Sequence, residues 1–479
     1  MSSIKEAARQ MKRTAPEMAS ASLNKRNQAL WNIAEALEAE KQEIFAANRE
    51  DLEAAKRENL AEAVQKRLKY DEAKMRDSIA GLRQLEGLAD PVGRQLMARQ
   101  LDEGLDLYRV SVPIGVIGVI FEARPDAMVQ VASLCIKSGN CAVLKGGKET
   151  ARTNRVLFSL IKNAVLKAGL PEGCLFQAEG HSEIDELLSC DEEVDLLIPR
   201  GSNRFVRYIM EHTRIPVMGH SSGICHIYVD EKVDQEQAIP IIVDAKTQYP
   251  AACNAVETLL VHRGIAEEFL PRAAEALAKA GVRLRGTKEA ADLLECLGKG
   301  AAASKQGDLC DLAKERTEAG VCGEGRAAAR IAADDVMQET DFGTEYGDLT
   351  LSVKLVGGVE EAAEHINQYG SHHTDAILTT DDEAAEYFLQ RVDSAGVYRN
   401  CSTRFADGFR YGFGAEVGIS TGKLHARGPV GLEGLVTYKY RLYGHGQIVS
   451  DYVLGRKSFC HKEVSDAPDS CGNRQGRNR

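Results

Sequence analysis

The sequence lacks an excess of basic residues. Its 479 residues include 60 lysines and arginines against 71 aspartates and glutamates, which gives a formal net charge of -11 at pH 7. Proteins that bind nucleic acid or anionic membranes through their overall charge concentrate Lys and Arg. We therefore expect neither a nucleic acid nor a membrane among its partners.

The sequence also lacks long apolar runs and regularly spaced cysteines. The longest apolar stretch, residues 110–121, contains glycines and is far shorter than the ~20 residues of a membrane-spanning helix, so we interpret it as a buried strand. The first five residues do not follow the charged-then-apolar order of a signal peptide. The 12 cysteines are irregularly spaced, which is typical of a reducing compartment. We expect a cytoplasmic protein.

Residues 296–340 lack a sustained strand pattern, and they differ from the rest of the chain in composition. We predict a surface insertion or a mobile loop here. Its cysteines, Cys296, Cys310 and Cys322, lack the close pairing of zinc ligands, so the sequence predicts no metal site. The polar tail, residues 466–479, is predicted to be disordered.

Periodic patterns fill most of the remaining chain. From Ile4 to about Arg83, apolar residues recur three or four positions apart, which predicts amphipathic helices. Beyond Tyr108, short apolar runs alternate with helical patterns, as expected for βαβ units with parallel sheets. The fold class is therefore α/β, with two such domains and a boundary near residues 222–223. The predicted strands are residues 116–120, 141–144, 194–198, 227–229 and 258–261.

The most informative segment, residues 246–262, places Cys253 behind two alanines, between a predicted helix and an apolar strand. A thiolate in such a turn could attack a substrate carbonyl. The alternative is a small buried cysteine that only packs against its neighbours. No other cysteine of this chain has such a setting.

Four long segments now identify a family: residues 112–126, 246–262, 404–416 and 423–433. With them, the chain resembles the gamma-glutamyl phosphate reductases, also called glutamate-5-semialdehyde dehydrogenases, a branch of the aldehyde dehydrogenase superfamily. The similarity runs from the first helices to about Tyr440 and is interrupted by residues 296–340.

The resemblance implies an aldehyde-dehydrogenase-like fold, with two α/β domains of largely parallel sheets and a small oligomerisation element. We expect N-terminal helices and an NADP-binding domain in residues 1–222 and a catalytic domain in residues 223–405. Residues 406–465 would form a C-terminal return segment that mediates oligomerisation through strands at 438–440 and 447–450.

The implied reaction is the NADPH-dependent reduction of L-glutamyl 5-phosphate to L-glutamate 5-semialdehyde, with inorganic phosphate as product, in proline biosynthesis. Cys253 is the nucleophile by motif, and a thioester is electrophilic enough for hydride transfer. The turn at Asn254 could direct backbone N–H groups at the developing oxyanion. Glutamate kinase, expected as a separate protein, is a hypothetical transient partner.

The resemblance also suggests a cofactor site. The segment 143–149 keeps the superfamily's lysine at Lys145, and it has Lys148 where an acid often binds the adenosine ribose. An ammonium group attracts a 2′-phosphate, so we predict NADP rather than NAD. Gly201 and Ser202 match a helix start that meets the pyrophosphate, and Glu345 matches the nicotinamide-ribose acid. The alternatives are a solvated loop for residues 143–149, an ordinary N-cap for Gly201 and Ser202, and a solvent-exposed carboxylate for Glu345. There is no Gly-x-Gly-x-x-Gly fingerprint.

The chain departs from the superfamily at two points. Hydrolytic members carry a water-activating glutamate in the segment that matches residues 216–223, where the nearest residue here is His220. His220 either acts as a base or packs within its loop. The oxyanion asparagine has no counterpart in residues 121–125, so the donors of the oxyanion hole stay open.

The anionic groups of the substrate require cations that pair with them. Arg124 and Arg404 are the candidates, with Ser402 and Thr403 as hydroxyl donors, although the arginines could instead form structural ion pairs. Two rival functions remain: a hydrolysing semialdehyde dehydrogenase, and a non-catalytic binding protein that has kept the fold.

Overall fold

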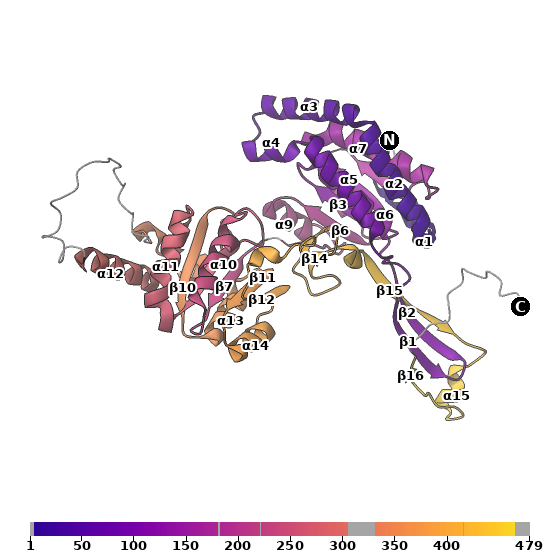
Figure 1. The fold of residues 1–479 in the computed structure, drawn as a ribbon. Coiled ribbons are helices and arrows are strands. Elements are labelled where there is room, and N and C mark those ends of the chain that lie inside the picture. Colours follow the sequence, from indigo (N-terminus) through magenta and orange to yellow (C-terminus); the bar gives the residue numbers. More distant parts are fainter. Residues whose placement is uncertain (1–3, 181–182, 221, 305–330, 415, 465–479) are drawn as a thin grey trace, which may run out of the picture. The chain divides into compact units, whose positions relative to one another are not determined.

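The computed structural model describes residues 4–180, 183–220, 222–304, 331–414 and 416–464 (Figure 1). Contacts divide the chain into two compact units. Among the described residues, unit 1 contains those up to Gly219, residues 412–419 and those from Leu424 onward. Unit 2 contains His220 to Tyr411 and residues 420–423. The sequence placed the boundary near residues 222–223 and set residues 406–465 apart, whereas most of that segment lies in unit 1.

Unit 1 begins with amphipathic helices, as the sequence predicted. Ser22 and Asp71 cap two of them by accepting a backbone N–H bond in the first turn. Their apolar residues Leu30, Ile33 and Leu37 are buried in the main core of this unit. The helices are α1 (Ile4–Ser20), α2 (Leu23–Ala39), α3 (Lys41–Arg57), α4 (Glu62–Leu68) and α5 (Glu72–Gly87).

The main sheet of unit 1 is parallel, in the order β5-β4-β3-β6. The chain proceeds outward from β3 to β5 and then returns to form β6 on the other side of β3. This reversal is the position at which open α/β sheets bind ligands, at the carboxyl ends of the strands. The elements are β3 (Val116–Phe121), α6 (Pro125–Lys137), β4 (Cys141–Gly146), α7 (Ala151–Lys167), β5 (Leu175–Ala178), α8 (Glu183–Leu188), β6 (Leu196–Arg200) and α9 (Asn203–Glu211).

A small antiparallel sheet also belongs to unit 1 (Figure 1), in the order β15-β2-β1-β16. It consists of β1 (Gln95–Asp102), β2 (Leu105–Pro113), β15 (Val436–Tyr443) and β16 (Lys462–Glu463). The single strand predicted for residues 110–121 is wrong, because the segment supplies both β2 and β3. Gly115, with φ of +134°, separates them and lies so close to Asp195 that a Cβ would be 2.3 Å from its Oδ2.

The strand predicted at residues 447–450 is also wrong. Val449–Val453 form a short helix, α15. The Gln447 side chain bonds the Glu103 carbonyl and the His445 N–H group, which holds the preceding loop closed. Val449 and Val453 are more than 70% exposed, so their apolar character reflects no burial within the chain. The short β13 (Gly418–Ser420) and β14 (Gly428–Val430) form a separate two-stranded sheet.

Unit 2 has a six-stranded parallel sheet, in the order β12-β11-β7-β8-β10-β9. Apolar residues pack on both faces: Leu259 and Val261 in one core, Tyr228 and Leu260 in the other. The strands are β7 (Cys225–Val229), β8 (Val256–His262), β9 (Arg283–Gly286), β10 (Thr350–Val356), β11 (Thr374–Leu378) and β12 (Gly396–Arg399). The helices are α10 (Gln235–Thr247), α11 (Ala266–Lys279), α12 (Lys288–Ser304), α13 (Val359–Tyr369) and α14 (Asp382–Arg391).

The prediction of a surface insertion at residues 296–340 is wrong for its last part. Ile331 and Met337 are buried, and Val336 forms an isolated bridge to Gly286 of β9. Such isolated anchors leave no periodic pattern, so they could not be predicted from the sequence. Residues 305–330 and the predicted disordered tail, 466–479, lie outside the described residues. None of the helices in the described ranges is long and apolar enough to span a membrane.

Candidate active site

Cys253 lies in a tight turn between α10 and β8. The N–H groups of Ala252 and Ala255 bond carbonyls within the turn, those of Tyr249 and Ala252. Gly223 packs directly against it: a Cβ there would be 2.5 Å from Cys253 Cα and 2.2 Å from its carbonyl oxygen. The turn therefore requires a glycine at residue 223. Cys253 itself is half-buried.

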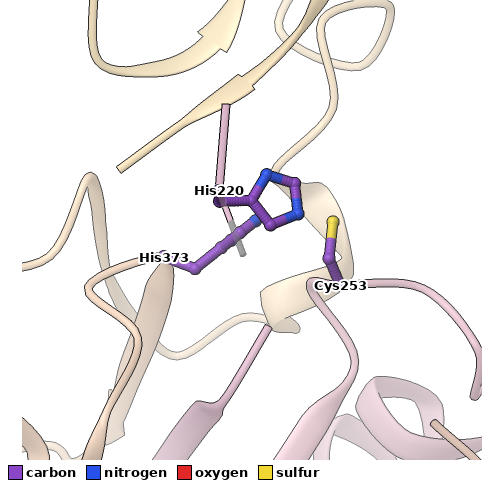
Figure 2. A group of neighbouring side chains, drawn as sticks. All are labelled: His220, Cys253 and His373. Carbon is purple, nitrogen blue, oxygen red and sulfur yellow. The ribbon is translucent and has the colours of Figure 1, made fainter. Parts of the chain in front are cut away.

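Two histidines of unit 2 meet the cysteine (Figure 2). One ring nitrogen from each of His220 and His373 and the sulfur of Cys253 all lie within 4.8 Å of one another. The imidazole rings stand nearly perpendicular, with their centroids 5.0 Å apart. Such a group can move a proton on or off the sulfur, and it also has the donor atoms of a metal site.

His373 has one ring nitrogen without a partner. Its Nδ1 lies 2.9 Å from the Thr374 hydroxyl oxygen, whereas its Nε2 is buried and has no hydrogen-bond partner among the described residues. A buried polar atom left unpaired is costly, and such atoms concentrate where a ligand or a reacting group completes them. The ring is therefore positioned by Thr374, and one nitrogen remains for chemistry.

The loop after β12 clamps the cysteine turn from the other side. In the 3-10 helix η5 (Thr403–Phe405), the Thr403 hydroxyl donates to the Asn254 carbonyl at 2.7 Å. The Asn254 amide donates in return to the Ala406 carbonyl at 2.8 Å. Asn254 Oδ1 is buried without a partner in the described part of the chain.

These bonds change the expected role of two residues. The sequence predicted Ser402 and Thr403 as hydroxyl donors to the substrate. Thr403 is fully buried and its hydroxyl is committed to Asn254, while Ser402 is 5% exposed and accepts the Arg404 N–H bond. Both residues shape the loop, and Thr403 fixes the turn that carries Cys253.

Arg404 has a second cation beside it. Its Nε donates to Gln248 at 2.9 Å, and Arg410 donates to the Arg404 carbonyl at 2.7 Å. Burial lowers the pKa of Arg404, and the positive charge of Arg410 lowers it further. Two like charges held together favour the binding of an anion.

A buried ion pair joins the two ends of the cysteine turn. Lys246, near the end of α10, donates to Glu257 of β8 at 2.8 Å, and both side chains are almost fully buried. Burial raises the pKa of Glu257 to about 7, although Lys246 opposes this shift. The Gly347 N–H group also bonds Glu257, which links the segment of Glu345 to this pair.

The predicted cofactor residues of unit 1 lie at the carboxyl ends of β4 and β6. Lys145 is buried and donates to the Gly146 carbonyl at 2.8 Å, and burial lowers its pKa. Lys148 is exposed and forms a loose ion pair with Glu58 at 3.7 Å. The neighbouring Glu149 instead turns inward and accepts the Ala123 N–H bond. The outward charge of this loop is therefore positive, as NADP would require.

The predicted pyrophosphate position at the start of α9 already holds a carboxylate. Ser202 donates its N–H to Glu122 at 3.0 Å, and a Cβ at Gly201 would lie 2.5 Å from the same oxygen. A phosphate could use this N–H group only after Glu122 had moved. Ala123, with φ of +47°, begins the loop that leads to the exposed Arg124. Thus the exposed ammonium of Lys148 fits a dinucleotide phosphate, the helix start fits only after rearrangement, and Lys145 is buried with its ammonium bonded to Gly146.

The sequence reasoning missed three residues of this site. His373 lies in the pair His372–His373 immediately before β11, and two histidines in front of an apolar strand were the available signal. Arg410 lies inside the recognised segment 404–416 but was not singled out. Gly223 was used only to mark a domain boundary.

The comparisons with known proteins agree with this architecture. Residues 1–415 match the aldehyde dehydrogenase family. The chain is 50% identical to the gamma-glutamyl phosphate reductase of Acetivibrio thermocellus, which covers 97% of this chain and 99% of the relative. It is also 50% identical to gamma-glutamyl phosphate reductase 1 of Synechocystis, with the same coverage.

Solved structures place the fold in the same group. The crystal structure of gamma-glutamyl phosphate reductase from Thermotoga maritima has a TM-score of 0.82 and 36% identity, over 92% of this chain and 99% of that one. The glyceraldehyde-3-phosphate dehydrogenase GapN of Methanocaldococcus jannaschii, complexed with NADP, has a TM-score of 0.59 at 18% identity, over 93% and 96%. The second likeness concerns the fold alone.

Proposed function

Because the chain belongs to the aldehyde dehydrogenase family and, within it, to the gamma-glutamyl phosphate reductases, we propose that Cys253 carries the glutamyl group of its substrate as a thioester. The activity of this group is the reduction of gamma-glutamyl phosphate in proline biosynthesis. The observation that supports the role of Cys253 is its half-buried sulfur, within reach of two imidazoles.

Proton transfer starts the reaction. The unpaired Nε2 of His373 accepts the thiol proton of Cys253, because Nδ1 is engaged with Thr374 and a buried nitrogen gains a partner in this way. The thiolate then attacks the C5 carbonyl of L-glutamyl 5-phosphate. The carbon–oxygen bond to phosphate breaks, and phosphate leaves with the electron pair.

The thioester is reduced in the second half of the reaction. NADPH, when bound, supplies the hydride that converts the thioester to a thiohemiacetal. As the thiohemiacetal oxyanion re-forms the carbonyl of the semialdehyde, the carbon–sulfur bond breaks, and the released thiolate of Cys253 takes back the proton from His373. The resting thiol and the neutral imidazole are thereby restored.

Arg404 and Arg410 are proposed to pair with the anionic groups of the substrate. They are two cations held on one loop, and that loop is bonded to the residue after Cys253. A guanidinium matches a phosphate or a carboxylate with two parallel hydrogen bonds. Arg124 remains a second candidate for this role, as the sequence suggested.

For the cofactor, we propose NADP(H) held by Lys145 and Lys148, with Gly201 and Ser202 near the pyrophosphate and Glu345 on the nicotinamide ribose. The exposed ammonium of Lys148 and the inward-turned Glu149 support a 2′-phosphate. The GapN neighbour was solved with NADP, and this agrees with the proposal at the level of the fold.

The remaining partners are also proposals. We expect homo-oligomers to form through the sheet that contains β15, because Tyr438, Tyr440 and Leu442 are each more than half exposed. A transient complex with glutamate kinase would shield the labile acyl phosphate, and co-sedimentation tests it. The nine described cysteines are free, which supports a cytoplasmic location.

Replacement of Cys253 tests the proposal. Cys253→Ala is expected to bind NADPH but to lose phosphate-dependent NADP reduction with glutamate 5-semialdehyde. Cys401→Ser removes another partly buried thiol of unit 2 and is expected to stay active. Retained activity in Cys253→Ala would show that another residue is the nucleophile.

A phosphate titration separates the two rivals. Oxidation without added phosphate would indicate the hydrolysing dehydrogenase that His220 keeps under consideration. No turnover under any condition, together with slow alkylation of Cys253, would indicate the binding protein. We expect turnover that depends on phosphate.

A further inference from the structure

The donors around Cys253 match those of a zinc site. Thiolate sulfur and imidazole nitrogen are both zinc ligands, and catalytic zinc sites use three protein ligands and keep a fourth position open. Zinc bonds of about 2.0 to 2.3 Å place tetrahedral ligands roughly 3.5 Å apart. The three atoms here lie within 4.8 Å of one another, so small side-chain rotations bring them to that spacing.

His373 shows a further property of a metal ligand. Histidines that bind metals usually have their second ring nitrogen fixed by another group, which orients the ring and sets the tautomer. Here Nδ1 is held by the Thr374 hydroxyl, and Nε2 is buried and unpaired within the described residues. His373 is 1% exposed, so a cation that reaches Nε2 loses most of its water.

We propose that Cys253, His220 and His373 bind Zn²⁺ in the resting protein and that the bound ion reversibly inhibits turnover. Binding replaces the thiol proton, which is released to solvent, and no redox change occurs. The sulfur electron pair then bonds to the metal and cannot attack a carbonyl. The metal site depends on the residues alone, whereas the inhibition rests on the proposed function.

The chemistry of the donors also sets the selectivity. Sulfur and imidazole nitrogen favour Zn²⁺ and Co²⁺, while Mg²⁺ and Ca²⁺ prefer oxygen ligands. Cations of the second kind should therefore neither bind here nor inhibit.

Cobalt is the direct probe. Titration of the reduced, metal-free protein with Co²⁺ should give one equivalent with a thiolate-to-cobalt charge-transfer band, and Zn²⁺ should displace it. Cys253→Ser should remove the band. His373→Asn should weaken binding by at least about tenfold, since even outer-sphere changes cost metal sites that much.

Two matched variants act as controls. His372→Asn changes the adjacent histidine, which has φ of +59°, a conformation that asparagine tolerates. Cys401→Ser removes another thiol of unit 2. Both should keep the cobalt band. A band that survives Cys253→Ser, or that His372→Asn removes as strongly as His373→Asn, would overturn the proposal, as would cobalt binding without the band.

Alkylation gives a readout that does not depend on turnover. Zn²⁺ should slow the labelling of Cys253 by iodoacetamide, and EDTA should restore the rate, whereas Mg²⁺ should have no effect. Unchanged labelling under saturating Zn²⁺ would refute the site. That result would leave the Cys253 mechanism intact, because the mechanism is judged by the activity of Cys253→Ala in metal-free buffer.

Discussion

The two units use opposite edges of their parallel sheets. In unit 1 the candidate cofactor residues end strands or follow them: Lys145 and Lys148 at β4, Gly201 after β6. In unit 2 the reactive residues precede strands: Cys253 before β8, His373 before β11. The carboxyl edge is where ligands are expected in open α/β sheets, and only unit 1 follows that rule. Position relative to a strand is therefore a poor guide to the reactive centre of unit 2.

The amino edge of unit 2 is held together by different means. A close backbone contact at Gly223, the Thr403 bond to Asn254 and the buried Lys246–Glu257 pair fix the cysteine turn. The Thr403 bond joins segments 149 residues apart, whereas the Lys246–Glu257 pair is local. At the carboxyl edge of unit 1, by contrast, both lysines lie within four residues of each other, Lys145 in β4 and Lys148 just after it.

Among these substitutions, the largest loss of activity is expected at His373, on the amino edge of the unit 2 sheet. His373→Asn removes the proposed proton acceptor, so kcat/KM should fall by about 10² to 10⁴. The matched variant His372→Asn should keep near-normal activity, because the His372 side chain bonds the Asp393 carbonyl rather than Cys253. Steady-state kinetics measures both. Equal losses of kcat/KM in the two variants would show that activity depends on the conformation of the loop and not on the Nε2 atom of His373.

The second-largest loss of activity is expected for Gly223→Ala. The added methyl group would overlap the backbone of Cys253, so the turn must shift. A displacement of the reacting group by about 1 Å can cost on the order of 10²-fold in rate, and overpacking costs roughly 1–3 kcal/mol of stability. Gly343→Ala, where nothing lies within 4 Å of an added Cβ, is the control. Normal turnover in Gly223→Ala would remove the argument for a tightly held turn.

A smaller effect is expected at the carboxyl edge of unit 1. Lys148→Glu should raise the KM for NADPH by about tenfold and leave that for NADH nearly unchanged, because only NADPH has the 2′-phosphate. Lys162→Glu makes the same charge change on the exposed face of α7 and should alter neither value. Equal increases in the KM values for NADPH and NADH would show that Lys148 does not bind the 2′-phosphate.

The smallest effect concerns the interior of unit 2 and appears only in acid. Burial, with smaller contributions from the neighbouring His226 and Lys354, lowers the pKa of His365 to about 2. The unfolded chain takes up a proton near pH 6.5 while the folded protein does not. The stabilisation that comes from keeping His365 neutral is therefore fully present above pH 6.5. Below pH 6.5 the free energy of unfolding falls by up to about 1.4 kcal/mol per pH unit. Denaturant unfolding at pH 7 and 5.5 should show a shallower loss in His365→Leu than in the parent protein; equal losses would contradict the prediction.

The sequence predicted the α/β class, the helical beginning and the core strands, because their apolar periodicity records burial directly. Through the recognised segments it also predicted Cys253 and Arg404 as site residues, and these assignments stay predictions. It did not identify His373, whose role arises only when β11 is placed near β8 through β7. It could not show that the Thr403 hydroxyl bonds the Asn254 carbonyl, since a hydroxyl in a motif looks the same whether it meets a substrate or a backbone carbonyl. The helix at residues 449–453 was missed because one exposed turn has no periodicity.

The most direct test of the role of Cys253 is to look for the thioester itself. The protein would be mixed with freshly made glutamyl phosphate without NADPH, quenched in acid, digested and examined by mass spectrometry. The account predicts a glutamyl group on the peptide that contains Cys253, lost on addition of hydroxylamine and absent after prior alkylation. A glutamyl group on another residue, or phosphate release by the active protein with Cys253 unmodified, would contradict it.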